Sequence, residues 1–396
     1  MLVHWIWLST RSGMSEREKY ILLQHFGDPE DIFYEKHFDV KPDAKESLLD
    51  KDLSAARKIL DDCADLGIHI CTLQDAAYPA RLKNIADPPL VLYYKGRLPD
   101  FDSAPAVAIV GTRKASAYGL STAQKMGYQI AKCGAIVVTG LAGGIDGAGA
   151  KGALMADGTV VGVLGCGADK VYPAFHKSLY ADTEHQGCLI TEFPPHTPPF
   201  GWNFPKRNRI MSGLSNGVLV VEAPEKSGAL ITARDAAEQG RDVFCVPGNI
   251  DVETFAGSNA LLRDGATPVF CGWDVVSEYQ GLYGDKVHPF TAADYSEKSL
   301  LKVAQKPLTP DKSPSFDRKK EKKPIDKSGK QPYSDIHDAL SPEQRKIVDL
   351  LKNGEKLLDE IIAESGMSAQ NVSSVVTMLQ IKGIISKKAG NILSLK

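Results

Sequence analysis

Six short apolar runs in the middle of the chain constrain its fold more than any other feature. Nearly every position in these runs is apolar, and glycine-containing turns or helical stretches separate one run from the next. Strands that are apolar on both faces are typical of a parallel sheet covered by helices on both sides. The runs are 107–110, 135–139, 159–164, 188–192, 217–222 and 242–246. They predict an α/β fold, with an extended, Rossmann-like doubly wound sheet in a domain over residues 101–283.

Helical spacing appears between these runs and before them. Within the sheet domain it covers 117–132, 145–155 and 229–239. Residues 1–100 are predicted to form a mostly helical domain. There, Ser15 and Glu18 have the spacing of a capping box, which starts a helix. Gly67 stands where a second helix, over 52–66, is expected to end.

The last third of the chain divides into a linker and a small domain. Residues 284–336 contain several prolines and the basic run 318–323, and they lack an apolar period, so we expect a flexible linker. The basic run is either a solvated tether or a weak contact for phosphates. Residues 337–396 combine three helical stretches with two short apolar runs, at 384–386 and 392–394. That pattern predicts a winged-helix domain.

Composition limits the classes of function. Hydrophobic residues make up 43% and charged residues 24% of the chain, as in ordinary folded soluble proteins. The formal net charge is −2, so any nucleic-acid site must be a local basic patch. The seven cysteines form no CxxC pair, and we expect reduced core thiols and no metal site. No apolar run approaches the roughly 20 residues that span a bilayer. The N-terminus also lacks a secretion-signal pattern, so we expect a cytoplasmic protein without membrane contact.

Two glycine-containing loops follow the first two predicted strands, where open parallel sheets bind ligands. The first contributes Gly111, Thr112, Arg113 and Lys114, and the second contributes Gly140, Gly143 and Gly144. Backbone N–H groups in such loops can face an anion, and the two cations can contact phosphate. The first loop matches neither a dinucleotide nor an ATP signature. The alternative for the first loop is a tight turn with solvated basic residues. For the second loop it is close helix–strand packing, with Asp146 capping the next helix.

Two further loops carry candidate binding residues. In one, aromatic residues precede a cationic cluster: Trp202, Phe204, Lys206, Arg207, Asn208 and Arg209. Aromatic faces for bases and cations for the backbone are what single strands require. The alternative is that the aromatic side chains pack against the domain edge. In the other loop, Ser227 precedes a helix start that could bind an anion or simply be capped by the serine.

No catalytic constellation appears in the sequence. The histidines are scattered, without the spacing of metal ligands, and no Gly-x-Ser-x-Gly nucleophile elbow is present. We therefore predict a binding protein, without enzymatic activity and without a cofactor.

The order of several motifs is more specific than any single loop. The motifs are YPxxLxxIxDPPxxLYxxG at 78–96, VAIVGTRK at 107–114, VTGLAGGIDG at 138–147, GCGADKVYP at 165–173, PKRNRIMSGLS at 205–215, VEA at 221–223, GALITA at 228–233, VPG at 246–248 and GSN at 257–259. Together they closely resemble the DprA/Smf family of DNA-processing proteins, strongly over about 70–272 and more loosely outside.

The resemblance implies a Rossmann-like domain that binds single-stranded DNA without cutting it, forms a homodimer and loads RecA in natural transformation. It places Arg113, the 206–209 segment and the 140–144 loop in the DNA pocket. It also implies a SAM-like or helix-hairpin-helix-like module at the N-terminus and a winged helix at the C-terminus. The expected recognition helix, 368–381, contains no Lys or Arg. A role in partner binding or packing is therefore expected, rather than reading of duplex DNA.

Two other hypotheses remain open. One is a nucleotide-binding enzyme similar to the lysine-decarboxylase-like phosphoribohydrolases, although their PGGxGTxxE signature is absent after Val221. The other is a winged-helix transcription regulator with a ligand-sensing α/β domain. The uncharged recognition helix disfavours this regulator.

Overall fold

A computed structural model describes residues 2–290, 342–352 and 354–368, together with short segments at 371–372, 375–376, 379, 384–388 and 392–395. The chain divides into two compact units, Met1–Ser313 and Pro314–Lys396. Most of the linker predicted over 284–336, including its basic run, lies outside the described residues.

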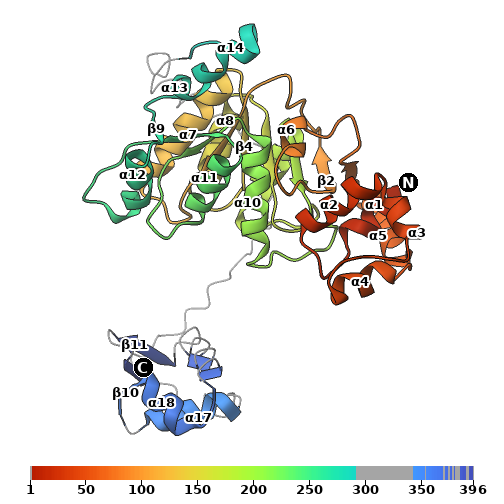
Figure 1. Cartoon of the computed structure of the whole chain (residues 1–396). Helices are drawn as coiled ribbons and strands as arrows, with labels where there is room; N and C mark the ends of the chain where they lie inside the picture. The colour runs from red at the N-terminus through yellow and green to blue at the C-terminus, as the bar shows by residue number, and fades with distance from the viewer. Residues whose placement is uncertain are drawn as a thin grey trace, which may run out of the picture. The chain divides into compact units, whose positions relative to one another are not determined.

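A sheet of nine strands, in the order β1-β2-β6-β5-β4-β3-β7-β8-β9, organises the first unit (Figure 1). The strands are β1 (His69–Thr72), β2 (Val91–Gly96), β3 (Ala106–Val110), β4 (Ile136–Thr139), β5 (Val160–Val163), β6 (Cys188–Thr191), β7 (Gly217–Val220), β8 (Asp242–Cys245) and β9 (Thr267–Pro268). Strands β3 to β9 pair in parallel, whereas β1 and β2 are antiparallel to each other, and β2 is antiparallel to β6. The chain steps from β3 to β6 in one direction and then returns to β7 on the other side of β3. This reversal makes β3 and β7 the switch point of a doubly wound sheet.

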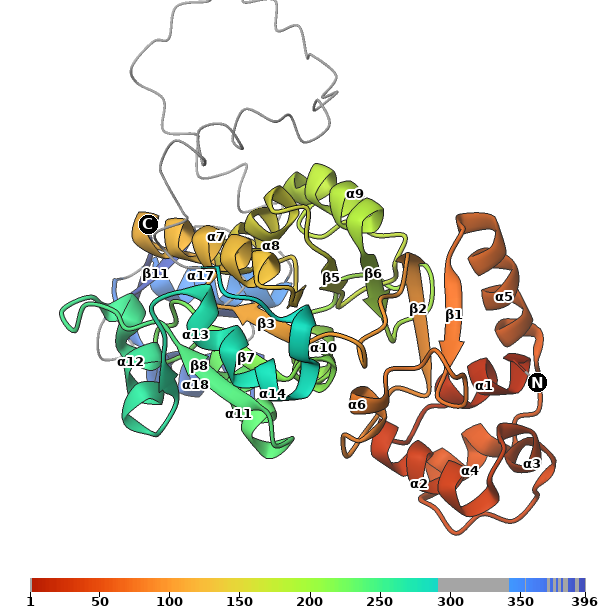
Figure 2. The same cartoon turned by 90° about the horizontal axis from the view of Figure 1, so that it is seen from above.

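Helices cover both faces of this sheet (Figure 2). They are α7 (Ala117–Lys132), α8 (Ile145–Met155), α9 (Lys177–Gln186), α10 (Asn203–Leu214), α11 (Gly228–Glu238), α12 (Ala256–Arg263), α13 (Gly272–Val276) and α14 (Gln280–Tyr283), with short 3-10 turns at Ala174–His176, Glu253–Phe255, Ser277–Tyr279 and Gly284–Lys286. Val107 and Ile109 of β3 pack with α7 and α8, whereas Ala108 and Val110 pack with α10 and α11. The alternation explains why the strands are apolar throughout. The Rossmann-like fold class is confirmed, and the bounds of α7 and α8 match the prediction.

The N-terminal helices form a compact group beside the edge strand β1 and its neighbour β2 (Figures 1 and 2). They are α1 (Leu2–Ser9), α2 (Glu16–Phe26), α3 (Pro29–Tyr34), α4 (Pro42–Leu49) and α5 (Ser54–Leu66), and the short α6 (Ala80–Lys83) follows β1. The capping box at Ser15 is present, and Gly67 ends α5 in the left-handed conformation, as predicted. However, β1 and β2 lie within the range predicted to be helical, and they extend the sheet. The helical part before the sheet therefore ends at Leu66.

Replacing Ser15 with alanine is expected to lower the free energy of unfolding by about 1 kcal/mol. The serine Oγ accepts from the backbone N–H of Glu18, and the Glu18 carboxylate accepts from the Ser15 backbone N–H at 2.7 Å. Urea titration of both proteins measures the difference. Ser121→Ala is a suitable control because Ser121 is an exposed residue inside α7 and caps no helix.

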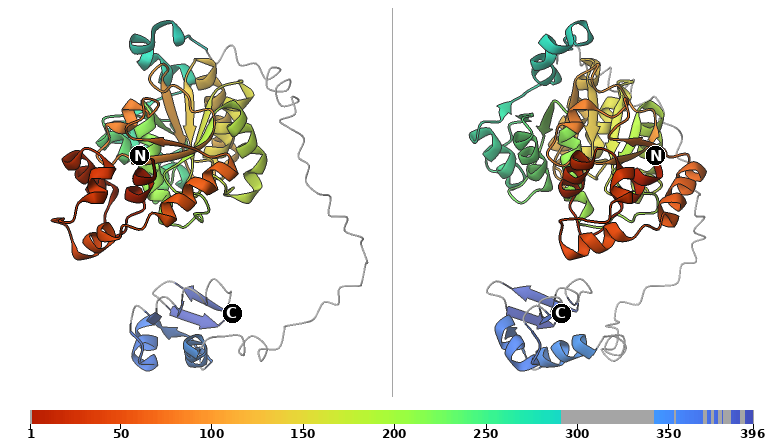
Figure 3. Two further views of the ribbon diagram at one scale, coloured as in Figure 1. Left: turned by 90° about the vertical axis from the view of Figure 1, so that its right-hand side faces the viewer. Right: turned by 45° about the vertical axis from the view of Figure 1, so that its right-hand side comes forward.

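The second unit contains a three-stranded antiparallel sheet with its helices on one face (Figure 3). Its described elements are α17 (Pro342–Leu351), β10 (Lys356–Leu357), α18 (Leu358–Ser365), β11 (Ile385–Lys388) and β12 (Ile392–Leu395). Ile347, Ile361 and Leu393 are fully buried in its small core. Most of the predicted recognition helix at 368–381 lies outside the described residues.

The cysteines of the chain lie mostly in its core. Six cysteines are buried and Cys271 is half-buried, and all seven are unpaired, as expected for core thiols. Among the described helices, none combines the length and apolar character needed to cross a membrane.

Candidate nucleic-acid interface

A pocket of about 300 Å³ lies at the carboxyl ends of β3 and β7, beside the switch point. We call it the switch-point pocket. It is lined by Val110, Gly111, Thr112, Arg113, Ala142, Asp146, Phe204, Pro205, Arg207, Asn208, Met211, Pro224, Lys226, Ser227, Gly228, Ala229, Ile231 and Thr232. All four segments singled out in the sequence thus contribute to one pocket.

The loop after β3 is held in shape by Glu222, a fully buried residue that follows β7. The Thr112 N–H donates to the Glu222 carbonyl at 2.7 Å, and the Ser116 hydroxyl donates to the Glu222 carboxylate at 2.8 Å. Ser116 in turn caps α7. These bonds leave the side chains of Arg113 and Lys114 exposed. The predicted cationic loop is therefore present, on a fixed backbone.

The glycine loop after β4 packs closely against neighbouring parts of the protein. A Cβ at Gly140 would overlap the guanidinium of Arg207, and Gly144 has φ +78°, which other residues rarely adopt. Gly143 is more open, with only Phe175 near a Cβ placed there, at 3.4 Å. Close packing explains why position 140 is a glycine, and the positive φ explains why position 144 is one. Neither glycine needs a ligand to explain it.

Arg207 and Asp146 are two buried groups of opposite charge that line the pocket. The Arg207 guanidinium donates to the Val163 carbonyl at 2.6 Å, and the Asp146 carboxylate accepts from the Gly140 N–H at 3.1 Å. Burial raises the pKa of Asp146, although the charge of Arg207 opposes the rise. Burial likewise lowers the pKa of Arg207, opposed by Asp146. The Nε of Arg207 has no hydrogen-bond partner among the described residues.

The cationic cluster differs from the sequence expectation. Residues from Asn203 onward form α10 instead of a loop, and the helix turns Arg207, Asn208 and Arg209 into the protein, where each is less than a tenth exposed. Arg209 bonds Glu192 at 2.5 Å and Asp87 at 2.9 Å, so its charge is already neutralised.

Lys206 is the exposed cation of this segment, but it does not line the switch-point pocket. It lines a separate hollow of about 320 Å³, together with Thr10, Glu16 and Glu192. The structure therefore does not bring Lys206 together with Arg113.

The aromatic residues divide into two groups. Phe204 lines the pocket, with the Arg113 guanidinium 5.2 Å from its ring centroid and the Tyr172 ring at 5.5 Å. Trp202 is 66% exposed and stacks on Phe200, with 4.7 Å between centroids and 14° between planes. The Phe204 ring therefore faces the pocket, and the Trp202 ring faces solvent.

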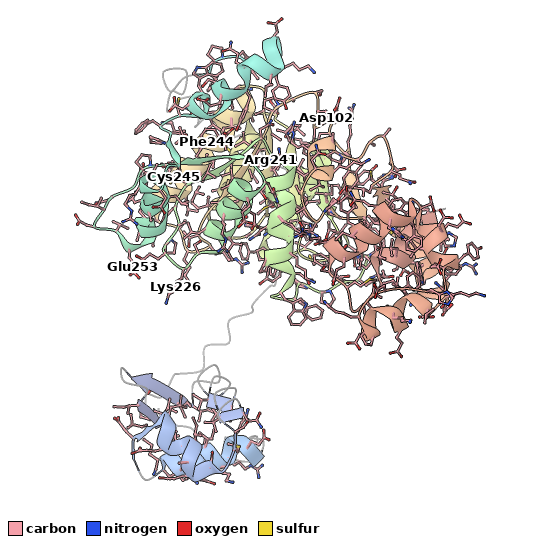
Figure 4. All side chains as sticks on the ribbon, in the orientation of Figure 1. Asp102, Lys226, Arg241, Phe244, Cys245 and Glu253 are labelled. Atoms are coloured by element: carbon pink, nitrogen blue, oxygen red, sulfur yellow. The ribbon has the colours of Figure 1, made fainter. Side chains whose placement is uncertain are left out.

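The loop after β7 supplies the remaining wall. Ser227 caps α11 through the Ala229 N–H, as one reading of the sequence expected, and Gly228 is exposed at the helix start. Lys226, labelled in Figure 4, is an exposed cation that projects from the surface of the unit. A cation and a helix N-terminus together favour an anionic ligand.

The sequence prediction missed Tyr172, Phe175 and the full role of Glu222. The VYP motif at 171–173 contained a signal for Tyr172, but contact with Phe204 depends on the fold. No group of three or more His, Cys, Asp or Glu side chains suited to a metal is found in the described parts of the chain.

Fold and site together define a doubly wound α/β protein with an exposed cationic loop over its switch-point pocket. A family model described as "DNA recombination-mediator protein A" matches residues 69–280, and one described as "DprA winged helix domain" matches 331–391. The chain belongs to the DprA/Smf family, as the motifs predicted, and the family's description is that of a DNA recombination mediator.

Individual relatives agree with this assignment. Protein Smf of Synechocystis is 35% identical over 323 residues, which cover 81% of this chain and 78% of the relative. DNA processing protein DprA of Bacillus subtilis is 39% identical over 221 residues, 56% of this chain and 74% of the relative. The X-ray structure of DNA processing protein A from Streptococcus pneumoniae is similar with a TM-score of 0.61 and 32% identity, covering 70% of this chain and 98% of that one.

Proposed function

We propose that this protein binds single-stranded DNA in the switch-point pocket and loads RecA onto the bound strand during natural transformation. It acts as a cytoplasmic homodimer and catalyses no reaction. The observation that carries the proposal is the cation–π contact between Arg113 and Phe204, which both line the pocket. This arrangement offers a phosphate contact and a base-stacking surface within one nucleotide's reach.

The rest of the pocket fits the same ligand. Thr112 and Lys114 continue the cationic loop, and Lys226 with the start of α11 provides a second anion contact on the opposite wall. Gly111 lines the pocket, and Gly143 is the most open of the glycines in the second loop, so a strand can approach the backbone at these positions. Phosphates make the larger contribution to affinity, so binding is tolerant of sequence and sensitive to salt.

Fluorescence anisotropy with a labelled single strand and the matching duplex, each at two salt concentrations, tests the proposal. Tighter, salt-dependent binding of the single strand, with the DNA left intact, is the expected result. Absence of binding to either form would refute it. Release of free base from nucleoside monophosphates would then support the phosphoribohydrolase alternative.

Replacing Arg113 with glutamate is expected to weaken single-strand binding by about tenfold or more. It is also expected to lower the slope of log K against log salt by about one. The change removes a phosphate contact and places a negative charge beside Phe204. Anisotropy titrations over a series of salt concentrations measure both effects. Arg57→Glu, an exposed arginine on α5, is the matched control and should change neither quantity by much.

Dimer formation and RecA loading are tested separately from DNA binding. Light scattering of the purified chain reports whether it is a dimer. A RecA-loading assay on strands coated with single-strand-binding protein reports mediator activity, and Arg113→Glu should reduce it in proportion to the lost affinity.

A further inference from the structure

An exposed apolar ridge lies beside the switch-point pocket, on the segment that joins β5 to α9. It consists of Val171, Tyr172 and Phe175, and we call it the Tyr172–Phe175 ridge. Phe175 is 74% exposed, and Val171 and Tyr172 are each 38% exposed. Leaving three apolar side chains in water on five consecutive residues is unfavourable unless they contact something.

The ridge is continuous with the pocket. The Tyr172 ring packs on Phe204, which lines the pocket, with centroids 5.5 Å apart. Phe175 lies against Gly143, next to the pocket residue Ala142. A ligand that stacks on Phe204 can therefore continue over the ridge without leaving the protein surface.

The ridge is held in place by bonds to the core. The hydroxyl of Tyr180 donates to the Tyr172 carbonyl at 2.8 Å, and the buried His176 ring bonds the Leu141 carbonyl at 2.9 Å. The second bond ties the ridge to the glycine loop. A preorganised aromatic surface loses little entropy when a ligand stacks on it.

Cations flank the ridge. Lys177 is exposed at the start of α9, whereas Lys170, whose side chain is 43% exposed, forms an ion pair with Asp169 at 3.0 Å. Lys151 is exposed on α8, near enough to His176 to lower its pKa, although burial lowers it more. Aromatic faces with cations at their edges suit the bases and phosphates of a single strand better than an apolar protein surface.

We propose that the Tyr172–Phe175 ridge is a second base-stacking subsite, over which the single strand runs after it leaves the switch-point pocket. The inference rests on the proposed function, because it assigns a path to the same ligand. It places the strand over the ends of β4 and β5. Lys206 and its hollow, on the side of the N-terminal helices, lie off this path.

Phe175→Ala tests the subsite, with a thymidine dinucleotide and thymidine oligonucleotides of about 4 to 16 nucleotides as probes. The variant should lose about fivefold or more in affinity for long oligonucleotides and keep wild-type affinity for the shortest, which fills the pocket alone. Phe175→Trp should restore the affinity. A 2-aminopurine placed along the strand should be quenched by the wild type and less so by Phe175→Ala.

Phe270→Ala is the matched control, since Phe270 is 75% exposed and follows β9 at the opposite edge of the sheet. Equal affinities of wild type and Phe175→Ala at every length would overturn the subsite. An equal loss in the Phe270 variant would do the same. Normal DNA binding with impaired RecA loading would identify the ridge as a protein contact instead, which also overturns it. If the wild type binds no single strand, the proposed function itself fails.

Discussion

Replacing Arg209 with methionine is expected to lower the free energy of unfolding by about 3 to 5 kcal/mol, while the folded variant still binds single-stranded DNA. Arg209 bonds Glu192 and Asp87, and the side chains of Arg209 and Glu192 are each no more than a tenth exposed. Burial already raises the pKa of Glu192, with Arg209 opposing the rise. Without the arginine, the buried Glu192 carboxylate either stays charged, which costs free energy of folding, or takes up a proton.

Urea titration followed by circular dichroism measures the loss of stability, and anisotropy well below the unfolding midpoint measures binding. Lys206→Met is the control on the same helix. Because Lys206 is exposed, this substitution should change the free energy of unfolding by no more than about 0.5 kcal/mol. A stable Arg209 variant that fails to bind DNA would instead support the direct DNA contact that the family resemblance implied.

The case of Arg209 shows where sequence reasoning reached its limit. The segment 203–209 was predicted to be a loop with three available cations. Helix α10 instead packs Ile210, Met211 and Leu214 against the sheet, and that orientation also turns Arg207 and Arg209 inward. The acidic partners Asp87 and Glu192 come from distant segments, so no local pattern could reveal them.

Local patterns predicted other features well. The apolar runs identified the six central strands because parallel strands buried on both faces need no polar alternation. Strand β1 was missed because it is the edge strand, where its first residue is exposed and no continuous apolar run is required. Strand β2 lies between β1 and β6 and contains the apolar run 90–94, which fell within the range predicted to be helical. The four loops of the pocket were found because the carboxyl ends of parallel strands meet at one edge.

The aromatic residues show a similar division. Phe204 and Trp202 were singled out because they precede cations in the sequence. Tyr172 and Phe175 belong to another loop, and only the fold brings Tyr172 to Phe204. Contacts between loops depend on strand order, which reverses between β6 and β7 and cannot be derived from spacing along the chain.

Replacing Arg207 with methionine is expected to lower the free energy of unfolding by about 3 to 5 kcal/mol at neutral pH, and by less at acidic pH. The variant removes the positive charge that most strongly opposes the effect of burial on Asp146, so the pKa of Asp146, already raised by burial, rises further. Between the ordinary value of 3.8 and that raised pKa, the folded state holds a proton that the unfolded state has lost. Stability therefore falls as pH rises through this window, and the deficit relative to the wild type shrinks as pH falls.

Urea titrations of the wild type and Arg207→Met across this pH range measure the effect. The double variant Arg207→Met/Asp146→Asn is the decisive comparison, because it removes the buried charge and keeps an oxygen to accept from the Gly140 N–H. It should be more stable than the single variant at neutral pH and should lose the pH dependence. A deficit that is constant with pH and persists in the double variant would mean that Arg207 acts through its bond to the Val163 carbonyl and through packing against Gly140. In that case the stabilising contribution would come from shape and hydrogen bonding, with no measurable part from the charge of Asp146.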